Sequence, residues 1–438
     1  MAITNYQVKC LLRHCTQVLG VILILMGTTS MARDLPGAKP ANSGVSAERL
    51  ARLDAAMQTE IDEHKKAGVI VLLARHGKVV HHKAYGMANI EAGKPMQKDS
   101  LVRLYSMTKP LTSVALLTLY EQGKFQLTDT LDKYIPEMKD LQVFTGENAY
   151  GVMTTEEPGR KPTIQDVFRH TAGFAYGNGT SPVDLLYQQN GIGYDTSSSL
   201  KEMVTERLPR MPLLYQPGKR WVYSVSHDVQ AYLVEYFSGM PYAEYLQKTI
   251  LDPLDMKDTY FGVPENIVDR YTANYGPGEK GELTQIENQN GNRPRGESGS
   301  YSRYTDIPFG GSGLSSTAMD YAKFAQMLLN GGELNGVRIL GSKTVELMTM
   351  NHLPANIGYL TGPSAGGGYG LGVSVLADQA VAGNLGSVGQ FGWGGAASTK
   401  VIMDPKEDMV AIFLTQYMPS EFSIINKWQT LVYQSIVE

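Results

Sequence analysis

A serine and a lysine three residues apart form the sharpest chemical signal in this chain. Ser106 and Lys109 lie in the string LYSMTKP, at the start of an apolar stretch over residues 111–119. Residues three apart share a helix face, so the two side chains can meet. A serine hydroxyl is a weak nucleophile until its proton is taken; a neutral lysine can accept that proton and a charged lysine stabilises the alkoxide. The alternative interpretation is an N-cap serine beside a surface lysine.

Two further segments supply groups that a nucleophilic site needs. Tyr223 lies in WVYS after a Pro-Gly pair, and a tyrosine beside a lysine can ionise below its usual pKa of about 10 and act as a general base. Residues 392–396 (GWGGA) precede an apolar strand-like segment, and glycines there let backbone N–H groups approach a substrate carbonyl. Taken singly, packing explains the tyrosine and a tight turn between strands explains the glycines.

Taken together, and in this order, the three segments resemble the serine β-lactamase and penicillin-binding-protein superfamily. The resemblance is closest to the class C β-lactamase-like branch that includes the family VIII carboxylesterases, and it extends from about residue 46 to 435. It implies that Ser106 is the acylated nucleophile, Lys109 its partner, and Tyr223 the general base and then the general acid. It also implies that the backbone N–H groups of Ser106 and Ala396 form the oxyanion hole.

Two positions depart from the β-lactamase pattern. Val225 stands where the third residue of the tyrosine motif is usually Asn, and Trp393 replaces the cation of the lysine-threonine-glycine triplet. An indole offers a flat apolar wall and one N–H donor where a cation would hold a carboxylate. The predicted substrate contacts are Trp393, Gly394, Gly395, Tyr105 and Val225. The departures favour an ester over an anionic amide, so the resemblance implies a carboxylesterase that works through an acyl-enzyme.

Other functions stay open at this point. A β-lactamase, a D-alanyl peptidase or an amide hydrolase would use the same groups, and so would an acyltransferase. A non-catalytic binding protein on the same fold would be favoured only if the serine, lysine or tyrosine were missing.

Ser364 in GPSAG matches a nucleophile elbow, but a polar loop precedes it where that motif needs a strand. The sequence assigns structural roles to His170, His227, Asp166 and Asp228.

Strands near both ends and helices between them must position these residues. Short apolar segments predict strands at 68–75, 78–85, 369–377, 398–403 and 409–415. Helical spacing of apolar residues predicts helices at 46–66, 320–329 and 421–437. The fold class is therefore α/β of the α+β type, β-lactamase-like, with an antiparallel sheet built from both termini and flanked by helices. A mostly helical subdomain is inserted, with a long loop at about 274–300.

This pattern predicts one β-lactamase-like serine hydrolase domain over residues 33–438. Its sheet subdomain is expected at about 46–105 and 336–438, and its helical subdomain at about 106–335. Of the 438 residues 42% are hydrophobic and 19% charged, which is enough to bury a core. The net charge of −4 gives no basic surface of the kind that binds nucleic acid.

The N-terminal segment predicts export. Lys9 and Arg13 precede a short apolar run at 18–26, and a small-x-small site ends at Ala32. This is the pattern of a secretory signal at residues 1–32, cleaved after Ala32; an uncleaved anchor is the alternative. Cleavage removes both cysteines, so no disulfide or cysteine metal site is expected. The prediction is a periplasmic or secreted enzyme acting on a small-molecule ester, with no cofactor, metal, nucleic acid or membrane contact, and an open oligomeric state.

Overall fold

The computed structural model describes residues 32–192, 199–286 and 307–438. The predicted signal segment lies outside these residues apart from Ala32, and so does the predicted loop beyond residue 286. Ala32 is buried, and its N–H donates to the carbonyl oxygen of Pro253 over 3.1 Å.

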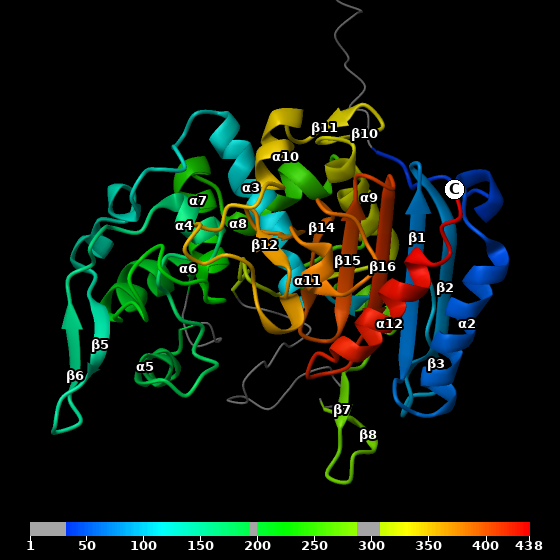
Figure 1. Cartoon of the computed structure of the whole chain (residues 1–438), viewed down its shortest axis with the longest axis horizontal. Coiled ribbons are helices and arrows are strands. Elements are labelled where there is room, and N and C mark those ends of the chain that lie inside the picture. Colours follow the sequence, from blue (N-terminus) through cyan, green and yellow to red (C-terminus); the bar gives the residue numbers. More distant parts are fainter. Residues whose placement is uncertain (1–31, 193–198, 287–306) are drawn as a thin grey trace, which may run out of the picture.

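One large antiparallel sheet forms the frame of the molecule (Figure 1). Its eight strands run in the order β12-β13-β14-β15-β16-β1-β2-β3. The strands from the start of the chain are β1 (Gly68–Arg75), β2 (Lys78–Asn89) and β3 (Lys94–Pro95). Those from its end are β12 (Gly367–Tyr369), β13 (Ser374–Leu376), β14 (Phe391–Gly395), β15 (Thr399–Asp404) and β16 (Met409–Thr415). The two groups meet where β1 pairs with β16, so the predicted sheet built from both termini is confirmed.

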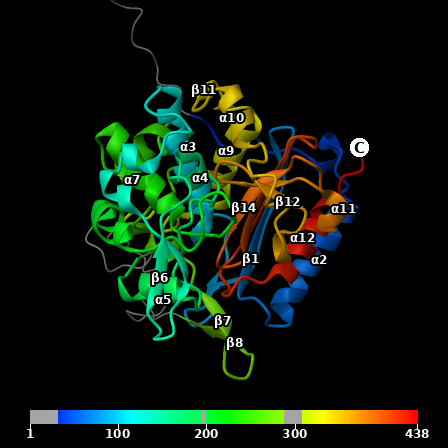
Figure 2. The ribbon, with the colours of Figure 1, turned by 60° about the vertical axis from the view of Figure 1, so that its left-hand side comes forward.

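Two terminal helices cover one face of this sheet (Figure 2). They are α2 (Ala47–Asp62) and α12 (Phe422–Tyr433). Ser46 begins the first of them as an N-cap, because its side chain accepts a hydrogen bond from the backbone N–H of Arg49. Leu53, Met57 and Trp428 are completely buried between these helices and the sheet.

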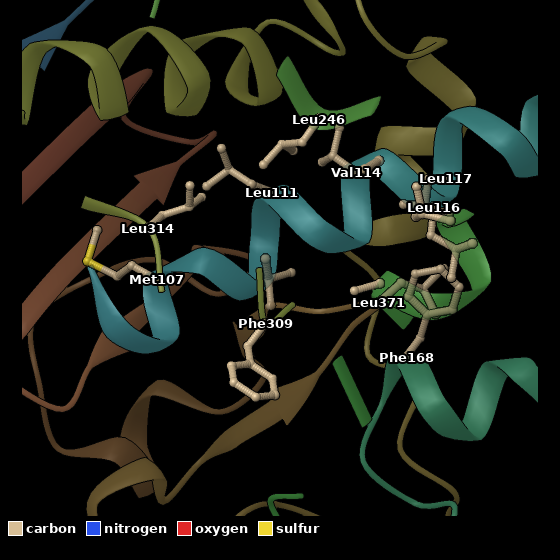
Figure 3. Packing of buried hydrophobic residues seen from close by; sticks show 14 of the residues in the cluster. Met107, Leu111, Val114, Leu116, Leu117, Phe168, Leu246, Phe309, Leu314 and Leu371 are labelled. Carbon is tan, nitrogen blue, oxygen red and sulfur yellow. The ribbon is translucent and has the colours of Figure 1, made fainter. Parts of the chain in front are cut away.

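The opposite face carries the main hydrophobic core and the other helices except α11 (Gln379–Ala382), which lies near α12 (Figure 2). The longer of these helices are α3 (Thr108–Glu121), α7 (Ser226–Ser238) and α9 (Ala318–Leu329). The shorter ones are α4 (Ile164–Phe168), α5 (Pro182–Gln189), α6 (Leu200–Glu202), α8 (Tyr242–Leu246) and α10 (Ser342–Met348). Leu111, Val114 and Leu117 of α3 pack among apolar side chains from several of these elements (Figure 3). Helix α3 is therefore held firmly from all sides.

Small two-stranded sheets complete the architecture. They are β4 (Val102–Arg103) with β9 (Ser315–Ser316), β5 (Val143–Glu147) with β6 (Met153–Glu156), β7 (Tyr275–Pro277) with β8 (Leu283–Gln285), and β10 (Glu333–Leu334) with β11 (Val337–Arg338).

Two predicted elements differ from the structure. The single strand expected at 369–377 is two short strands, β12 and β13, which pair antiparallel around a turn. Gly372 in that turn has φ +90°, and a Cβ there would overlap the side chain of Ser113 on α3, so the chain turns where a longer strand would run into α3. The predicted loop after residue 274 begins as the β7–β8 hairpin, which turns at Gly281 with φ +84°.

Candidate active site

Ser106 lies in a tight turn at the start of α3. The residues Tyr105–Met107 form a single 3-10 turn that runs directly into the helix. Tyr105 has φ +47°, a left-handed conformation that costs energy for a side chain of this size. Its ring is buried, and Asn274 Nδ2 donates to its hydroxyl over 2.6 Å. The strained turn leaves the Ser106 side chain partly exposed while the residues on either side are buried.

Lys109 follows one helical turn later and points at the serine. Its Nζ lies 3.3 Å from Ser106 Oγ and donates to the carbonyl oxygen of Gly311 over 2.7 Å. The side chain is completely buried. Burial lowers the pKa of Lys109 to about 7, against the opposing effect of the Asp228 carboxylate. Near neutral pH a large share of the lysine is therefore uncharged and able to accept a proton.

Asp228 on α7 faces the same lysine from the other side. Its Oδ1 accepts a hydrogen bond of 2.8 Å from the backbone N–H of Gly311, the residue whose carbonyl oxygen binds Lys109. Burial raises the pKa of Asp228 to about 6, while Lys109 opposes that shift. The sequence assigned this carboxylate a structural role. Asp228 ends the string Trp-x-Tyr-Ser-x-x-x-Asp, which begins at Trp221, but nothing in that string indicates its place beside Lys109.

Tyr223 lies immediately before α7 and above the lysine. The Lys109 Nζ is 4.5 Å from the centroid of the tyrosine ring, and Trp393 Nε1 donates to the tyrosine hydroxyl over 3.4 Å. Burial raises the pKa of Tyr223 above 10, although hydrogen bonds with Ser106 and Trp393 oppose the shift. The expectation that this tyrosine ionises below its usual pKa is therefore wrong. Loss of solvation outweighs these two hydrogen bonds, and the charge of Asp228 acts in the same direction as burial.

The end of β14 lies against the turn that carries the serine. A Cβ on Gly395 would overlap the carbonyl oxygen of Leu104, so only glycine lets the strand come this close. The hydroxyl of Ser420 donates to the carbonyl oxygens of Gly395 and Ala396 over 3.1 and 3.0 Å. The strand end next to Ser106 is thus held in one conformation. A Cβ on Gly394 would lie 2.9 Å from the carbonyl oxygen of Thr399 and 3.6 Å from the side chain of Lys400 on the neighbouring strand.

Aromatic rings line the site around the tyrosine. Tyr176 stacks on Tyr223 with ring centroids 5.4 Å apart, and Trp393 lies 5.7 Å from Tyr223 on another side. Trp221 extends this wall and packs on the completely buried ring of Tyr369, 5.6 Å away between centroids. The surface offered to a substrate beside Ser106 is consequently flat and apolar.

Of the predicted substrate contacts, Trp393 is placed at this wall and Val225 is not. Val225 is completely buried in the main hydrophobic core, where its backbone N–H donates to the carbonyl oxygen of Ala175. The Tyr105 ring is also buried, beneath the turn. The two residues border the site through the backbone, and their contact with a substrate stays a prediction.

Two buried histidines lie behind the tyrosine, and burial makes both of them weak bases. His170 Nδ1 accepts a hydrogen bond of 3.2 Å from the backbone N–H of Ser224, and the His170 ring lies 4.8 Å from the rings of both Tyr223 and His227. Burial, helped by the charge of Lys109, lowers the pKa of His170 well below 6.5, and the pKa of His227 shifts in the same direction. Both rings are neutral at pH 7, and His170 fixes the segment that carries the tyrosine.

Ser364 does not sit in a nucleophile elbow. It ends a three-residue 3-10 turn, Gly362–Ser364, which is followed by strand β12. The motif needs a strand before the serine and a helix after it, and the structure has neither. Ser364 instead lines a cavity next to Trp221.

Neither a metal centre nor a bilayer-crossing helix is present in the described parts of the chain. Over residues 32–192, 199–286 and 307–438, no three His, Cys, Asp or Glu side chains come together as a metal site would require. In the same ranges no helix combines the length and the apolar character that crossing a membrane demands.

Comparison with known proteins identifies the family. Residues 53–434 match the family model named Beta-lactamase. Protein Rv1367c of Mycobacterium tuberculosis is 32% identical over 364 residues, covering 81% of this chain and 86% of its own. Esterase EstB of Burkholderia gladioli is 29% identical over 387 residues, covering 84% and 91%.

A solved structure agrees with this result. EstCE1, described as a hydrolase with promiscuous acyltransferase activity, superposes with a TM-score of 0.74 and 26% identity, covering 88% of this chain and 98% of its own. The likeness to Esterase EstB and to EstCE1 supports the carboxylesterase-like branch. With a family match over most of its length and a serine hydrolase arrangement around Ser106, the chain belongs to the β-lactamase family of the serine β-lactamase and penicillin-binding-protein superfamily.

Proposed function

We propose that this protein is an exported serine hydrolase that cleaves carboxylic esters through an acyl-enzyme on Ser106. The observation that carries the proposal is the contact of Ser106 Oγ with a buried lysine whose pKa is about 7. A lysine with this pKa is matched to proton transfer at neutral pH. The aromatic wall at Trp393 supports an ester with an apolar part rather than an anionic amide.

In the proposed acylation step, neutral Lys109 takes the proton of Ser106 as Oγ attacks the ester carbonyl carbon. The oxyanion that forms is stabilised by the backbone N–H groups of Ser106 and Ala396. The bond to the leaving oxygen then breaks. Tyr223 gives its hydroxyl proton to the leaving alkoxide and regains one from the lysine ammonium. Its raised pKa suits this role, because the hydroxyl stays protonated until an alkoxide needs the proton.

Deacylation follows the same route with water in place of the alcohol. Water attacks the acyl carbon while its proton passes through Tyr223 to Lys109, and Ser106 Oγ leaves with a returned proton. An added alcohol that replaces water would give acyl transfer. EstCE1 is described as having that activity as a promiscuous one, which supports acyl transfer as a second candidate function.

The deciding experiment compares wild type with Ser106→Ala on a short-chain nitrophenyl ester and on a chromogenic cephalosporin. We expect ester turnover far above cephalosporin turnover, with both lost in the variant while its circular dichroism and melting temperature stay near those of wild type. Ester hydrolysis that persists in a clean Ser106→Ala preparation would refute the nucleophile. Faster cephalosporin turnover would replace the esterase by a β-lactamase. Product analysis with an added alcohol measures the acyl-transfer share.

Export is part of the same proposal. The charged start, apolar run and small-x-small site at residues 9–32 support a signal that is cleaved after Ala32. N-terminal sequencing of the protein from its host tests this: a chain starting at Arg33 in the extracytoplasmic fraction is expected. A chain retaining the apolar run would favour the membrane anchor.

A further inference from the structure

A cavity of about 490 Å³ adjoins the active site behind Trp221. It is bounded by residues 219–221, by the segment 356–364 and by Phe422 at the start of α12. The Trp221 ring lies 6.2 Å from that of Tyr223, measured between centroids, so the indole is a wall shared by the cavity and the catalytic groups. The volume lies in the range of small-molecule sites.

The charged residues on the lining of this cavity are both cations. Lys219 and Arg220 are exposed, and no described carboxylate lies within ion-pair distance of either. The Arg220 guanidinium lies over the Tyr215 ring, 5.5 Å from its centroid, which orders it without neutralising it. The other polar lining residues, Asn356, Thr361 and Ser364, are neutral. The cavity therefore attracts an anion.

Large apolar side chains stand exposed at the same place. Tyr359 is 45% exposed and Phe422 is 46% exposed, and Ile357 and Leu360 add further apolar lining. Exposed apolar groups gathered around one hollow mark binding surfaces in soluble proteins. A ligand that covers these side chains and reaches the two cations has an apolar body and an anionic end.

We propose that this cavity is a specificity subsite for a carboxylate carried on an apolar spacer of the ester substrate. The inference rests on the proposed esterase function and deepens it. Trp393 removes the cation next to the scissile bond, while Lys219 and Arg220 supply positive charge on the far side of Trp221. The positive charge that would bind a substrate carboxylate therefore lies away from the reacting carbonyl group. The carboxylate belongs to the remote end of the acyl or alcohol part, and its binding energy holds the ester in place.

The kinetic test uses two acyl chains of equal length, the mono-nitrophenyl ester of octanedioic acid and nitrophenyl octanoate. Wild type is expected to favour the charged ester in kcat/KM. The double variant Lys219→Gln, Arg220→Gln should lower the charged-to-neutral ratio by about two- to thirtyfold, the range for two solvent-exposed ion pairs. Lys219→Glu should lower the ratio further by repulsion. Lys248→Gln, an exposed lysine outside the cavity, is the matched control and should leave the ratio unchanged.

A binding measurement separates failure of the subsite from failure of the esterase function. Calorimetry of octanoate with Ser106→Ala, compared with the same protein also carrying Lys219→Gln and Arg220→Gln, requires no turnover. Tighter binding to the protein that retains both cations supports the subsite even if neither ester is hydrolysed. Equal binding, or no binding to either protein, refutes it even if ester hydrolysis is fast. A second ester pair with the carboxylate on the alcohol part then identifies which half of the substrate occupies the cavity.

Discussion

Replacing Asp228 by Asn tests the electrostatics of the lysine directly. A Cβ on Gly311 would stand 3.2 Å from both Lys109 Nζ and Asp228 Oδ1, so the amine and the carboxylate are at most about 6.4 Å apart. At an effective dielectric constant of about 20, unit charges at that separation attract by about 2.6 kcal/mol, or about 2 pKa units. Asparagine keeps the hydrogen-bond acceptor for the Gly311 N–H but removes the charge.

The direction of the pKa shift of Lys109 follows from which of its protonation states the Asp228 carboxylate favours. Asp228 favours the ammonium form and so raises the pKa of Lys109, which burial has lowered to about 7. Without that charge the pKa of Lys109 falls. Because the neutral amine is the active form, wild-type kcat/KM should rise with pH to half its plateau near pH 7. In Asp228→Asn the half-point should move to about pH 5, and the plateau should drop because a less basic amine is a weaker proton acceptor.

The assay is the pH profile of kcat/KM for a neutral nitrophenyl ester between pH 4 and pH 10. Glu235→Gln is the matched control: it lies two helical turns further along α7 and accepts a hydrogen bond from the Tyr242 N–H, which glutamine can keep. Its half-point should stay near pH 7. A half-point in Asp228→Asn that stays near pH 7, or that moves to higher pH, would show that neutral Lys109 is not the proton acceptor.

Two further predictions concern the frame of the site. Gly395→Ala brings a Cβ onto the carbonyl oxygen of Leu104, so esterase activity should fall more than a hundredfold, with a lower melting temperature; near-normal activity would show that β14 need not touch this turn. Asp166 is completely buried; burial opposes its ionisation, but hydrogen bonds from Arg160 and Arg169 outweigh it and lower its pKa from 3.8 to about 2. This depressed pKa contributes about 2.5 kcal/mol to the free energy of unfolding above pH 4, lost as the pH falls towards 2. Urea unfolding of Asp166→Asn should therefore show a smaller loss than wild type between pH 5 and pH 2, and equal losses would contradict the assignment.

The strongest local patterns predicted the frame well. Residues 68–75 and 409–415 are apolar except for Arg75 and Thr415 at their ends, and both form strands with these bounds because they are buried on both faces at the centre of the sheet. The prediction of a single strand at residues 369–377 is wrong. The composition of this segment is strand-like, but its contact with α3 at Gly372 breaks it into two strands. The residue pattern within a segment does not show which other elements that segment packs against.

The same distinction applies to the site. Spacing alone was enough to bring Ser106 and Lys109 together on one helix turn. The partnership of Lys109 with Asp228 joins two helices far apart in the sequence through the backbone of Gly311, and no local string contains it. The direction of the pKa shift of Tyr223 depends on how deeply the ring is buried. Burial is set by the folded molecule and not by the residues next to Tyr223 in the sequence.

The pairing of β1 with β16 has a consequence for when this protein becomes reactive (Figure 1). Ser106 leaves the ribosome early, but the central strand of the sheet finds its partner only after residues 409–415 have been made. Strand β14, which lies against the serine turn, is held in the same late-completed sheet. Non-local pairing of this kind is slow to form. A newly made chain is therefore inactive. If the proposed export takes place before folding, Ser106 gains its catalytic surroundings only after the chain has left the cytoplasm, where it cannot act on cytoplasmic esters.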